Sequence, residues 1–211
     1  MNSIYFCLVT SLIGLIAVVN LIYCIYGLPT SEDIKNIGVY IRKGSFAYLK
    51  REYIVLTPIV LIFSFILLFL FSWKFALFFV LGAALSVLSG FIGMSAATIA
   101  NYKTTYAAKS SMNKAVYSSL SGGAIMGIIT SSLGILGISI IYLICLKMKI
   151  VNPTNLIVAF SLGASFVALF ARVGGGIYTK GADIGADLVG KTEARIPEDD
   201  PRNPAEHRTN R

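Results

Sequence analysis

Five long apolar stretches constrain this chain more than any other feature. A helix needs about 20 apolar residues to cross the hydrocarbon core of a bilayer, and stretches of that length lie at about 4–27, 53–73, 75–100, 122–146 and 154–171. Only Trp73-Lys74 separates the second stretch from the third, which predicts an interfacial hairpin there. Charged residues make up 13% of the chain, whereas an ordinary soluble domain has about a quarter. The sequence therefore predicts an all-α polytopic membrane protein with about five transmembrane helices.

The distribution of charge divides the chain into two predicted regions. Residues 172–211 contain seven of the ten acidic residues and seven of the 18 basic ones, so the net charge of +8 belongs to residues 1–171. We expect residues 1–171 to form a transmembrane helical region. We expect residues 172–211 to form a cytoplasmic helix extension and an acidic loop. The basic residues are spread over short connections with no aromatic platform beside them, which argues against nucleic-acid binding.

The side of the membrane follows from the basic residues of the short connections. Eight lie on the side reached after the first and third stretches, and three lie on the other side. The eight are Lys35, Arg42, Lys43, Lys50, Arg51, Lys103, Lys109 and Lys114, and the three are Lys74, Lys147 and Lys149. We therefore expect an integral protein of the cell inner membrane with its N-terminus outside and its C-terminal tail in the cytoplasm. The first stretch lacks the basic start of a signal peptide and is too long for one, so a retained helix is favoured.

Small residues recur inside the apolar stretches at helical spacing. Gly90 and Gly93, Gly123 and Gly127, and Gly134 and Gly137 each lie about one turn apart. Because lipid gives no hydrophobic drive for helices to associate, small residues that allow close approach predict tight helix packing. The three cysteines, Cys7, Cys24 and Cys145, fall inside these stretches without metal-site spacing and are interpreted as packing residues.

A charged pattern follows the fifth stretch. If a helix continues past the triple glycine at 174–176, which is glycine-rich for a helix interior, then Lys180, Asp183, Asp187 and Lys191 share one face. Two aspartates one turn apart repel each other, and a bound Mg²⁺ would reverse this, because Mg²⁺ takes carboxylate and phosphate oxygens. An ordinary solvated face with Lys180–Asp183 and Asp187–Lys191 ion pairs fits the same spacing, and spacing alone favours it.

Two further residues allow two interpretations each. Arg172, where the fifth apolar stretch ends, suits either a side chain that extends to the membrane interface or an intramembrane gating charge. His207 is the only histidine and fits an exposed tail better than a catalytic role.

The exact residues of this region resemble a known family. FARVGGGIYTKGADIGADLVGKTE, at 170–193, closely resembles the signature of membrane-bound, ion-pumping pyrophosphatases, and so does IPEDDPRNP at 196–204. GSFAYL at 44–49, GFIGM at 90–94 and GGAIMG at 122–127 are similar to other parts of that family. The resemblance runs from about Asn36 to Ala205. It implies a homodimeric pump with about sixteen helices per subunit, which hydrolyses cytoplasmic Mg-pyrophosphate and moves protons or Na⁺ outward.

The resemblance also implies a role for each charged residue of the tail. Lys180, Asp183, Asp187 and Lys191 match the substrate-binding face, and Arg172 matches the arginine near the ion gate. Asp183, Asp187, Glu198 and Asp200 match metal ligands, with Glu193 in the same acidic region. The implied cofactor is Mg²⁺, with K⁺ dependence undetermined, and the implied partners are inorganic pyrophosphate, membrane lipid and a second subunit.

The sequence departs from the family pattern after Ala205. The family continues there with an Asp-Asn-Val-Gly-Asp motif, whereas this chain reads Glu206 to Arg211. Water-activating carboxylates are expected beyond Arg211, so the chain resembles the N-terminal part of the pump and is predicted to be inactive alone. The alternative is a non-enzymatic membrane protein that binds phosphate or assembles with a full-length pump subunit.

Overall fold

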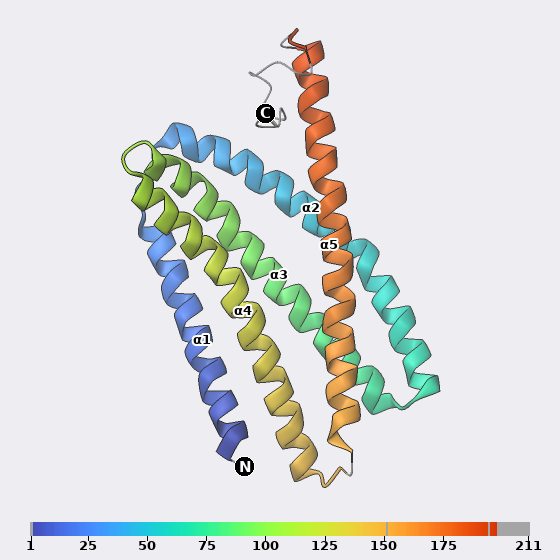
Figure 1. Ribbon diagram of the computed structural model, residues 1–211. Coiled ribbons are helices and arrows are strands. Elements are labelled where there is room, and N and C mark those ends of the chain that lie inside the picture. Colours follow the sequence, from blue (N-terminus) through green and yellow to red (C-terminus); the bar gives the residue numbers. More distant parts are fainter. Residues whose placement is uncertain (1, 151, 194, 198–211) are drawn as a thin grey trace, which may run out of the picture. The chain divides into compact units, whose positions relative to one another are not determined.

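The computed structural model describes residues 2–150, 152–193 and 195–197, and all regular structure within them is α-helical. Five helices follow one another along the chain: α1 (Asn2–Gly27), α2 (Glu32–Leu70), α3 (Trp73–Ala108), α4 (Met112–Lys147) and α5 (Pro153–Thr192) (Figure 1). Each of the five is long and apolar enough to cross a membrane. The predicted all-α polytopic class with five candidate spans is therefore confirmed.

The helices are longer than the apolar stretches. Residues 32–52, predicted as a connection, are the first half of α2, and α3 and α4 extend over most of 101–121. Several basic residues assigned to connections, Lys35 and Lys114 among them, therefore lie on helices. Hydropathy marks where a helix leaves the hydrocarbon layer, but not where its backbone hydrogen bonds end. At 1.5 Å per residue, α2 with its 39 residues is about 58 Å long, roughly twice the thickness of that layer.

The turn between α2 and α3 lies slightly before the predicted hairpin. The helices are interrupted at 71–72, and Trp73-Lys74 belong to the first turn of α3. Ser72 caps this helix, since its side chain accepts a hydrogen bond from the Phe75 N–H at 3.3 Å. A serine at this position satisfies a backbone N–H that has no partner within the helix, and this local chemistry decides where α3 begins.

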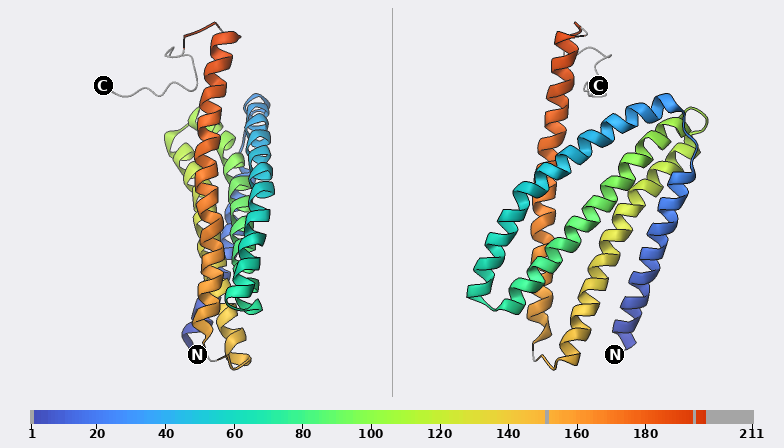
Figure 2. Two further views of the ribbon diagram at one scale, coloured as in Figure 1. Left: turned by 90° about the vertical axis from the view of Figure 1, so that its right-hand side faces the viewer. Right: turned by 180° about the vertical axis from the view of Figure 1, so that it is seen from behind.

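The chain divides into two compact units, Met1–Ala168 and Leu169–Arg211, and the boundary in the sequence falls within α5. In the first unit α3 packs against α2 on one side and α4 on the other, and α4 packs against α1 (Figure 2). The views also show that α2 bends. Pro58 lies inside this helix, and a proline bends a helix because it cannot donate to the preceding turn.

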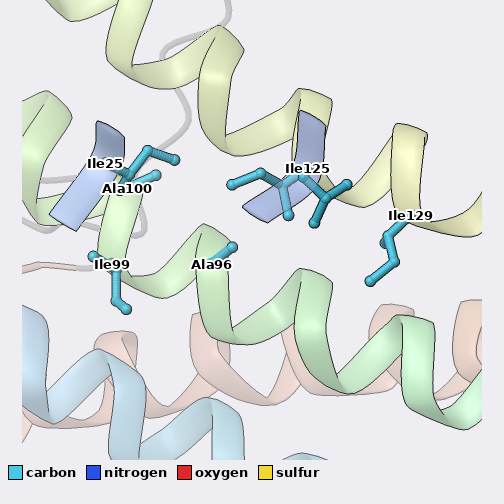
Figure 3. Packing of buried hydrophobic residues seen from close by; sticks show 7 residues of the cluster. Ile25, Ala96, Ile99, Ala100, Ile125 and Ile129 are labelled. Carbon is cyan, nitrogen blue, oxygen red and sulfur yellow. The ribbon is translucent and has the colours of Figure 1, made fainter. Parts of the chain in front are cut away.

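The core of the first unit lies where α1, α3 and α4 meet. Aliphatic side chains from all three helices form it: Val18, Ile25, Ala96, Ile99, Ala100, Ile125 and Ile129 (Figure 3). Alanine alternates with isoleucine on α3, so the larger side chains of α1 and α4 fit beside it. The cluster fixes the order of these three helices in the unit.

Glycines set the closest helix approaches. A Cβ on Gly82 of α3 would meet the backbone of Phe160, and a Cβ on Gly163 of α5 would meet the backbone of Phe79. Gly93 faces the Met126 side chain, and Gly137 faces the ring of Phe160. The predicted use of small residues in packing is therefore observed, though not at every predicted position. Gly123, Gly127 and Gly134 have open space around them.

Partly buried hydrogen bonds join α3 to α4 and to α2. The Thr104 hydroxyl of α3 donates to the Ser118 hydroxyl of α4 at 3.0 Å. The Tyr53 hydroxyl of α2 donates to the Val87 carbonyl of α3 at 3.2 Å. Polar bonds of this kind hold membrane helices together where hydrophobic attraction is weak.

The end of α4 is closed by a specific backbone motif. The Ile150 N–H donates to the Cys145 carbonyl at 2.9 Å, and the Lys149 N–H donates to the Leu146 carbonyl at 3.2 Å. These two bonds form a Schellman motif, which needs a left-handed residue just after the helix. Here that residue is Lys149, with φ of 52°, where glycine is the usual choice.

Candidate functional site

The candidate site lies on the second half of α5. This helix is continuous from Pro153 to Thr192 and passes through Gly174, Gly175 and Gly176 without a break. The triple glycine therefore does not end the helix, although glycine is unfavourable in a helix interior. Good helix formers flank the glycines, among them Ala171 and Ala182, and favour the helix on either side. Continuity of α5 meets the condition under which the four charged residues share a face.

The four residues form a stripe along α5. At 100° and 1.5 Å per residue, Lys180, Asp183, Asp187 and Lys191 fall within about 80° of the helix circumference and about 17 Å of its length. The lysines stand at the two ends and the carboxylates between them. Both aspartates are partly buried, and both lysines are exposed. Lys180 and Asp183, each in the described part of α5, form no ion pair with one another.

The stripe has the chemistry of a site for a metal–phosphate ion. Two carboxylates one turn apart offer oxygen ligands, which Mg²⁺ prefers, and they leave its other positions for phosphate oxygens and water. A lysine at each end would supply positive charge for phosphate groups that a metal did not neutralise. Among the described residues, no three carboxylate, histidine or cysteine side chains come together as a metal cluster. The donor set on α5 therefore fits part of a magnesium site.

Arg172 lies on the same helix, closer to the apolar half. It is exposed, and it precedes Asp183 by eleven residues, which turns it about 20° from that aspartate around the helix axis. Arg172 is thus in line with the stripe, about 17 Å nearer to the apolar segment. Glu193, one residue past the end of α5, is exposed. Glu198 and Asp200, predicted as metal ligands, lie outside the described residues.

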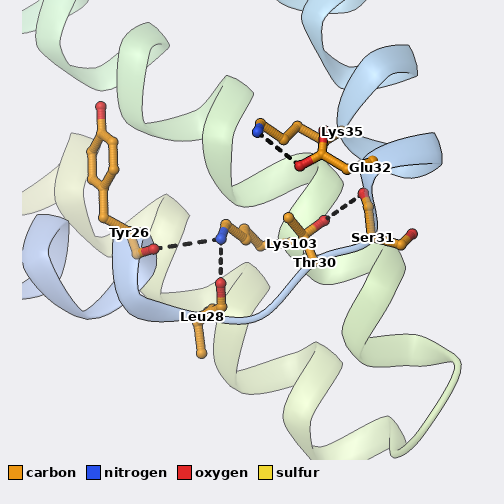
Figure 4. A network of polar contacts seen from close by, with 7 residues as sticks. All are labelled: Tyr26, Leu28, Thr30, Ser31, Glu32, Lys35 and Lys103. Atoms are coloured by element: carbon orange, nitrogen blue, oxygen red, sulfur yellow. Dashed lines mark hydrogen bonds and ion pairs between the residues drawn. The ribbon is translucent and has the colours of Figure 1, made fainter.

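One basic residue has a structural environment that sequence patterns did not reveal. Lys103 of α3 is only 8% exposed, and its ammonium group donates to the backbone carbonyls of Tyr26 and Leu28 at the end of α1 (Figure 4). The sequence showed Lys103 only as one more basic residue of a connection. Nearby, Lys35 pairs with Glu32 at 3.2 Å. No signal in the sequence separates a lysine that holds a helix end from one that is simply solvated.

Comparison with known proteins identifies the family. The family model described as inorganic H⁺ pyrophosphatase matches residues 12–206. A candidate K⁺-stimulated pyrophosphate-energized sodium pump of Clostridium tetani is 49% identical over 175 residues, which are 83% of this chain and 25% of that protein.

Two further relatives differ in their ion and in their response to K⁺. A K⁺-insensitive pyrophosphate-energized proton pump of Methanosarcina mazei is 45% identical over 177 residues, which are 83% of this chain and 26% of that protein. A K⁺-stimulated pyrophosphate-energized sodium pump of Thermotoga maritima is 37% identical over 193 residues, which are 83% of this chain and 27% of that protein. The chain spans about a quarter of the length of these relatives. It belongs to the inorganic H⁺ pyrophosphatase family of membrane-bound, ion-translocating enzymes.

Proposed function

We propose that this chain is the N-terminal part of a pump that couples hydrolysis of cytoplasmic Mg-pyrophosphate to outward movement of protons or Na⁺. The observation that carries the proposal is the unbroken course of α5, which joins an apolar stretch to the Lys180–Lys191 stripe. The names of the relatives point the same way, because all describe pyrophosphate-energized pumps. They divide between proton and sodium, and between K⁺-stimulated and K⁺-insensitive, so they leave both choices open for this chain.

The stripe is the proposed contact with the substrate. Lys180 and Lys191 bind phosphate oxygens of pyrophosphate, and Asp183 and Asp187 hold Mg²⁺, with Glu198 and Asp200 as further ligands. The metal, when bound, neutralises phosphate charge and makes phosphorus more open to attack. Arg172 lies toward the apolar half of the same helix and is proposed as a gate residue. A substrate site and a gate on one continuous helix offer a direct route for coupling.

We further propose that the protein lies in the cell inner membrane in the orientation that the basic residues indicate. The N-terminus is then outside, and the stripe is in the cytoplasm. A second copy of the subunit is the proposed partner. Orientation is tested by single cysteines at Lys74 and Lys109, in a background without the three native cysteines. A membrane-impermeant thiol reagent applied to intact cells is expected to label position 74 and not position 109; the opposite labelling would reverse the proposed topology.

Residues 1–211 alone are proposed to be inactive in hydrolysis. Attack on pyrophosphate needs metals on both phosphates, an oriented water molecule and a base within hydrogen-bond reach. One helix face supplies only part of this set. The purified chain with Mg²⁺ and pyrophosphate is therefore expected to release phosphate at the rate of a buffer control. Release above that control, lost on Asp187→Asn, would contradict the proposal.

The test of the stripe itself is a chimaera. Residues 12–206 of this chain replace the matching segment of the Methanosarcina mazei pump, and Mg²⁺-dependent phosphate release is measured in membrane vesicles. Asp183→Asn and Asp187→Asn are each expected to lower the rate by about 100-fold or more, because each removes a metal ligand. Asp33→Asn, an exposed aspartate in the first turn of α2, is the matched control and is expected to keep the rate. Equal rates for all three variants would show that the stripe is an ordinary solvated face.

One observation also supports a second function. The stripe on α5 by itself offers charged groups that suit phosphate, which fits a non-enzymatic membrane protein that binds phosphate or assembles with a full-length pump subunit. Co-expression with a tagged full-length pump separates the two. Stable co-purification of the 211-residue chain favours this second function, and its absence favours the first.

A further inference from the structure

A cavity of about 480 Å³ lies at one end of the first unit, and the pyrophosphate proposal does not use it. It lies between the end of α1 and the turn that joins α3 to α4. Its walls are formed chiefly by Leu28, Pro29, Lys103, Tyr106, Lys114 and Tyr117. All of these residues are far along the chain from the stripe on α5. They belong to the first unit, whereas the stripe belongs to the second.

The charge of the cavity is positive and uncompensated within its lining. Lys103 is held in place by the carbonyls of Tyr26 and Leu28 and lines the cavity. Lys114, on the first turn of α4, is exposed and lines it as well. Among the described residues, no carboxylate belongs to the lining, and the nearby Glu32 is paired with Lys35. Two ammonium groups facing one space without a counter-ion attract an anion.

The beginning of α4 adds to this preference. Ser110 and Asn113 on either side of the Ser111 cap also line the cavity. The Ser111 side chain makes no capping hydrogen bond, and the first turn of α4 holds no acidic residue. The first backbone N–H groups of a helix carry partial positive charge and donate hydrogen bonds to anions when no side chain caps them. The lysines and the helix start therefore favour the same kind of ligand.

The level of the cavity indicates what carries the anion. The apolar part of α1 ends at Gly27 and that of α3 at Ala100, so the cavity lies just beyond the hydrocarbon layer. Tyrosines are enriched at this level of a membrane, and Tyr106 and Tyr117 both line the cavity. Leu120, one turn further along α4 than Tyr117, is 68% exposed, so the surface of α4 next to the cavity is apolar there. A ligand with an anionic head and an apolar tail matches both parts.

We propose that this cavity binds the phosphate head group of an anionic phospholipid, with Lys103 and Lys114 contacting the phosphate oxygens. Basic pockets between transmembrane helices at the membrane surface are suited to such head groups. Lys103 is positioned by its two carbonyl partners, so little side-chain entropy is lost when a phosphate binds. Lys114 completes the contact from the facing helix. The site takes its lipid whether or not the chain takes part in pyrophosphate hydrolysis.

The test compares two lysines at the same end of the molecule. The purified 211-residue chain is mixed with equal amounts of phosphatidylglycerol and phosphatidylcholine of identical acyl chains, and bound lipid is counted by native mass spectrometry. We expect one phosphatidylglycerol to be retained in preference. Lys114→Gln is expected to lower its apparent affinity about fivefold, as loss of one lysine near an anionic lipid predicts. Lys109→Gln, exposed at the same turn but outside the lining, is expected to change it less than about twofold.

Several outcomes would overturn the proposal. Equal losses in the two variants would mean that the lipid responds only to general surface charge. Equal retention of the two lipids would mean that the cavity does not select an anionic head group. Full displacement of the lipid by inorganic phosphate at the same concentration would assign the cavity to a free phosphate ion instead. Lys114 is exposed, so its variant is expected to fold, and circular dichroism checks that it does.

Discussion

The close approach of α3 and α5 gives the sharpest prediction about stability. Gly82 and Gly163 face each other's helices, and each lies against backbone atoms rather than against a side chain that could move. A Cβ added at Gly163 would lie 2.8 Å from the Phe79 carbonyl carbon and 3.1 Å from the Ala83 nitrogen. Real Cβ atoms essentially never come as close as 2.8 Å to a backbone atom, so Gly163→Ala forces the two helices apart.

The cost follows from what surrounds this approach. Phe79, Ala83 and Phe160 are almost fully buried there, and a shift of the helices loosens all of their contacts together. Overpacking a well-packed interior costs about 1–3 kcal/mol. Since neither backbone segment can yield locally, we expect Gly163→Ala to lower the free energy of unfolding by an amount in the upper half of that range. This corresponds to a loss of roughly 30- to 150-fold in the ratio of folded to unfolded protein.

The assay is unfolding of the detergent-solubilised chain by increasing mole fractions of sodium dodecyl sulfate, followed by circular dichroism. Gly134→Ala is the matched control, because Gly134 is also helical and has open space around it. There the substitution is expected to be neutral or to stabilise by up to about 1 kcal/mol, the difference in helix propensity. The double variant Gly82→Ala/Gly163→Ala is expected to cost less than the sum, since one separation of the helices relieves both contacts. If Gly163→Ala proves as stable as Gly134→Ala, the reasoning about this contact is refuted.

Three further predictions use the same unfolding assay. Lys149→Gly is expected to stabilise the chain by about 1 kcal/mol, because glycine adopts a φ of 52° without steric cost, and no change would contradict the strain argument. Thr104→Val is expected to destabilise by about 1–2 kcal/mol, because the buried Ser118 hydroxyl loses its donor, and Thr104→Ser should restore stability. Tyr53→Phe is expected to cost about 1 kcal/mol through loss of the hydrogen bond to Val87, and an unchanged transition would show that this bond adds nothing.

Hydropathy predicted the number and order of the helices but not their ends. Four of the five apolar stretches each lie within one helix, because burial in lipid requires a continuous apolar helix, and the second, 53–73, runs past the end of α2 to the first residue of α3. Residues 32–52 form no continuous apolar stretch because eight of them are charged, yet they contain no proline and begin with Glu32 and Asp33, which favour the start of a helix. Such local features decide whether a helix continues from the membrane into water.

Residue spacing predicted the stripe on α5 but not the contacts of the glycines. Spacing predicted that Lys180, Asp183, Asp187 and Lys191 share a face, provided that the helix persists, and the structure meets that condition. Glycine spacing, by contrast, did not predict which glycines make contact. Gly82 and Gly163 meet backbone while Gly123 has open space, because the partner helix, not the spacing, decides which face is occupied. Lys103 illustrates the same limit, since its partners come from residues more than seventy positions away.

The triple glycine has a consequence for where α5 opens. Glycine is about 1 kcal/mol less favourable than alanine in a helix interior, so Gly174, Gly175 and Gly176 together lower the local stability by about 3 kcal/mol. A helix usually frays from its ends, but such a deficit places a second weak point in the interior of this one. Amide hydrogen exchange near these glycines should therefore outpace exchange one or two turns to either side. Between the apolar segment and the charged stripe, α5 thus contains a site of local unfolding, where the helix opens first while the segments on both sides stay helical.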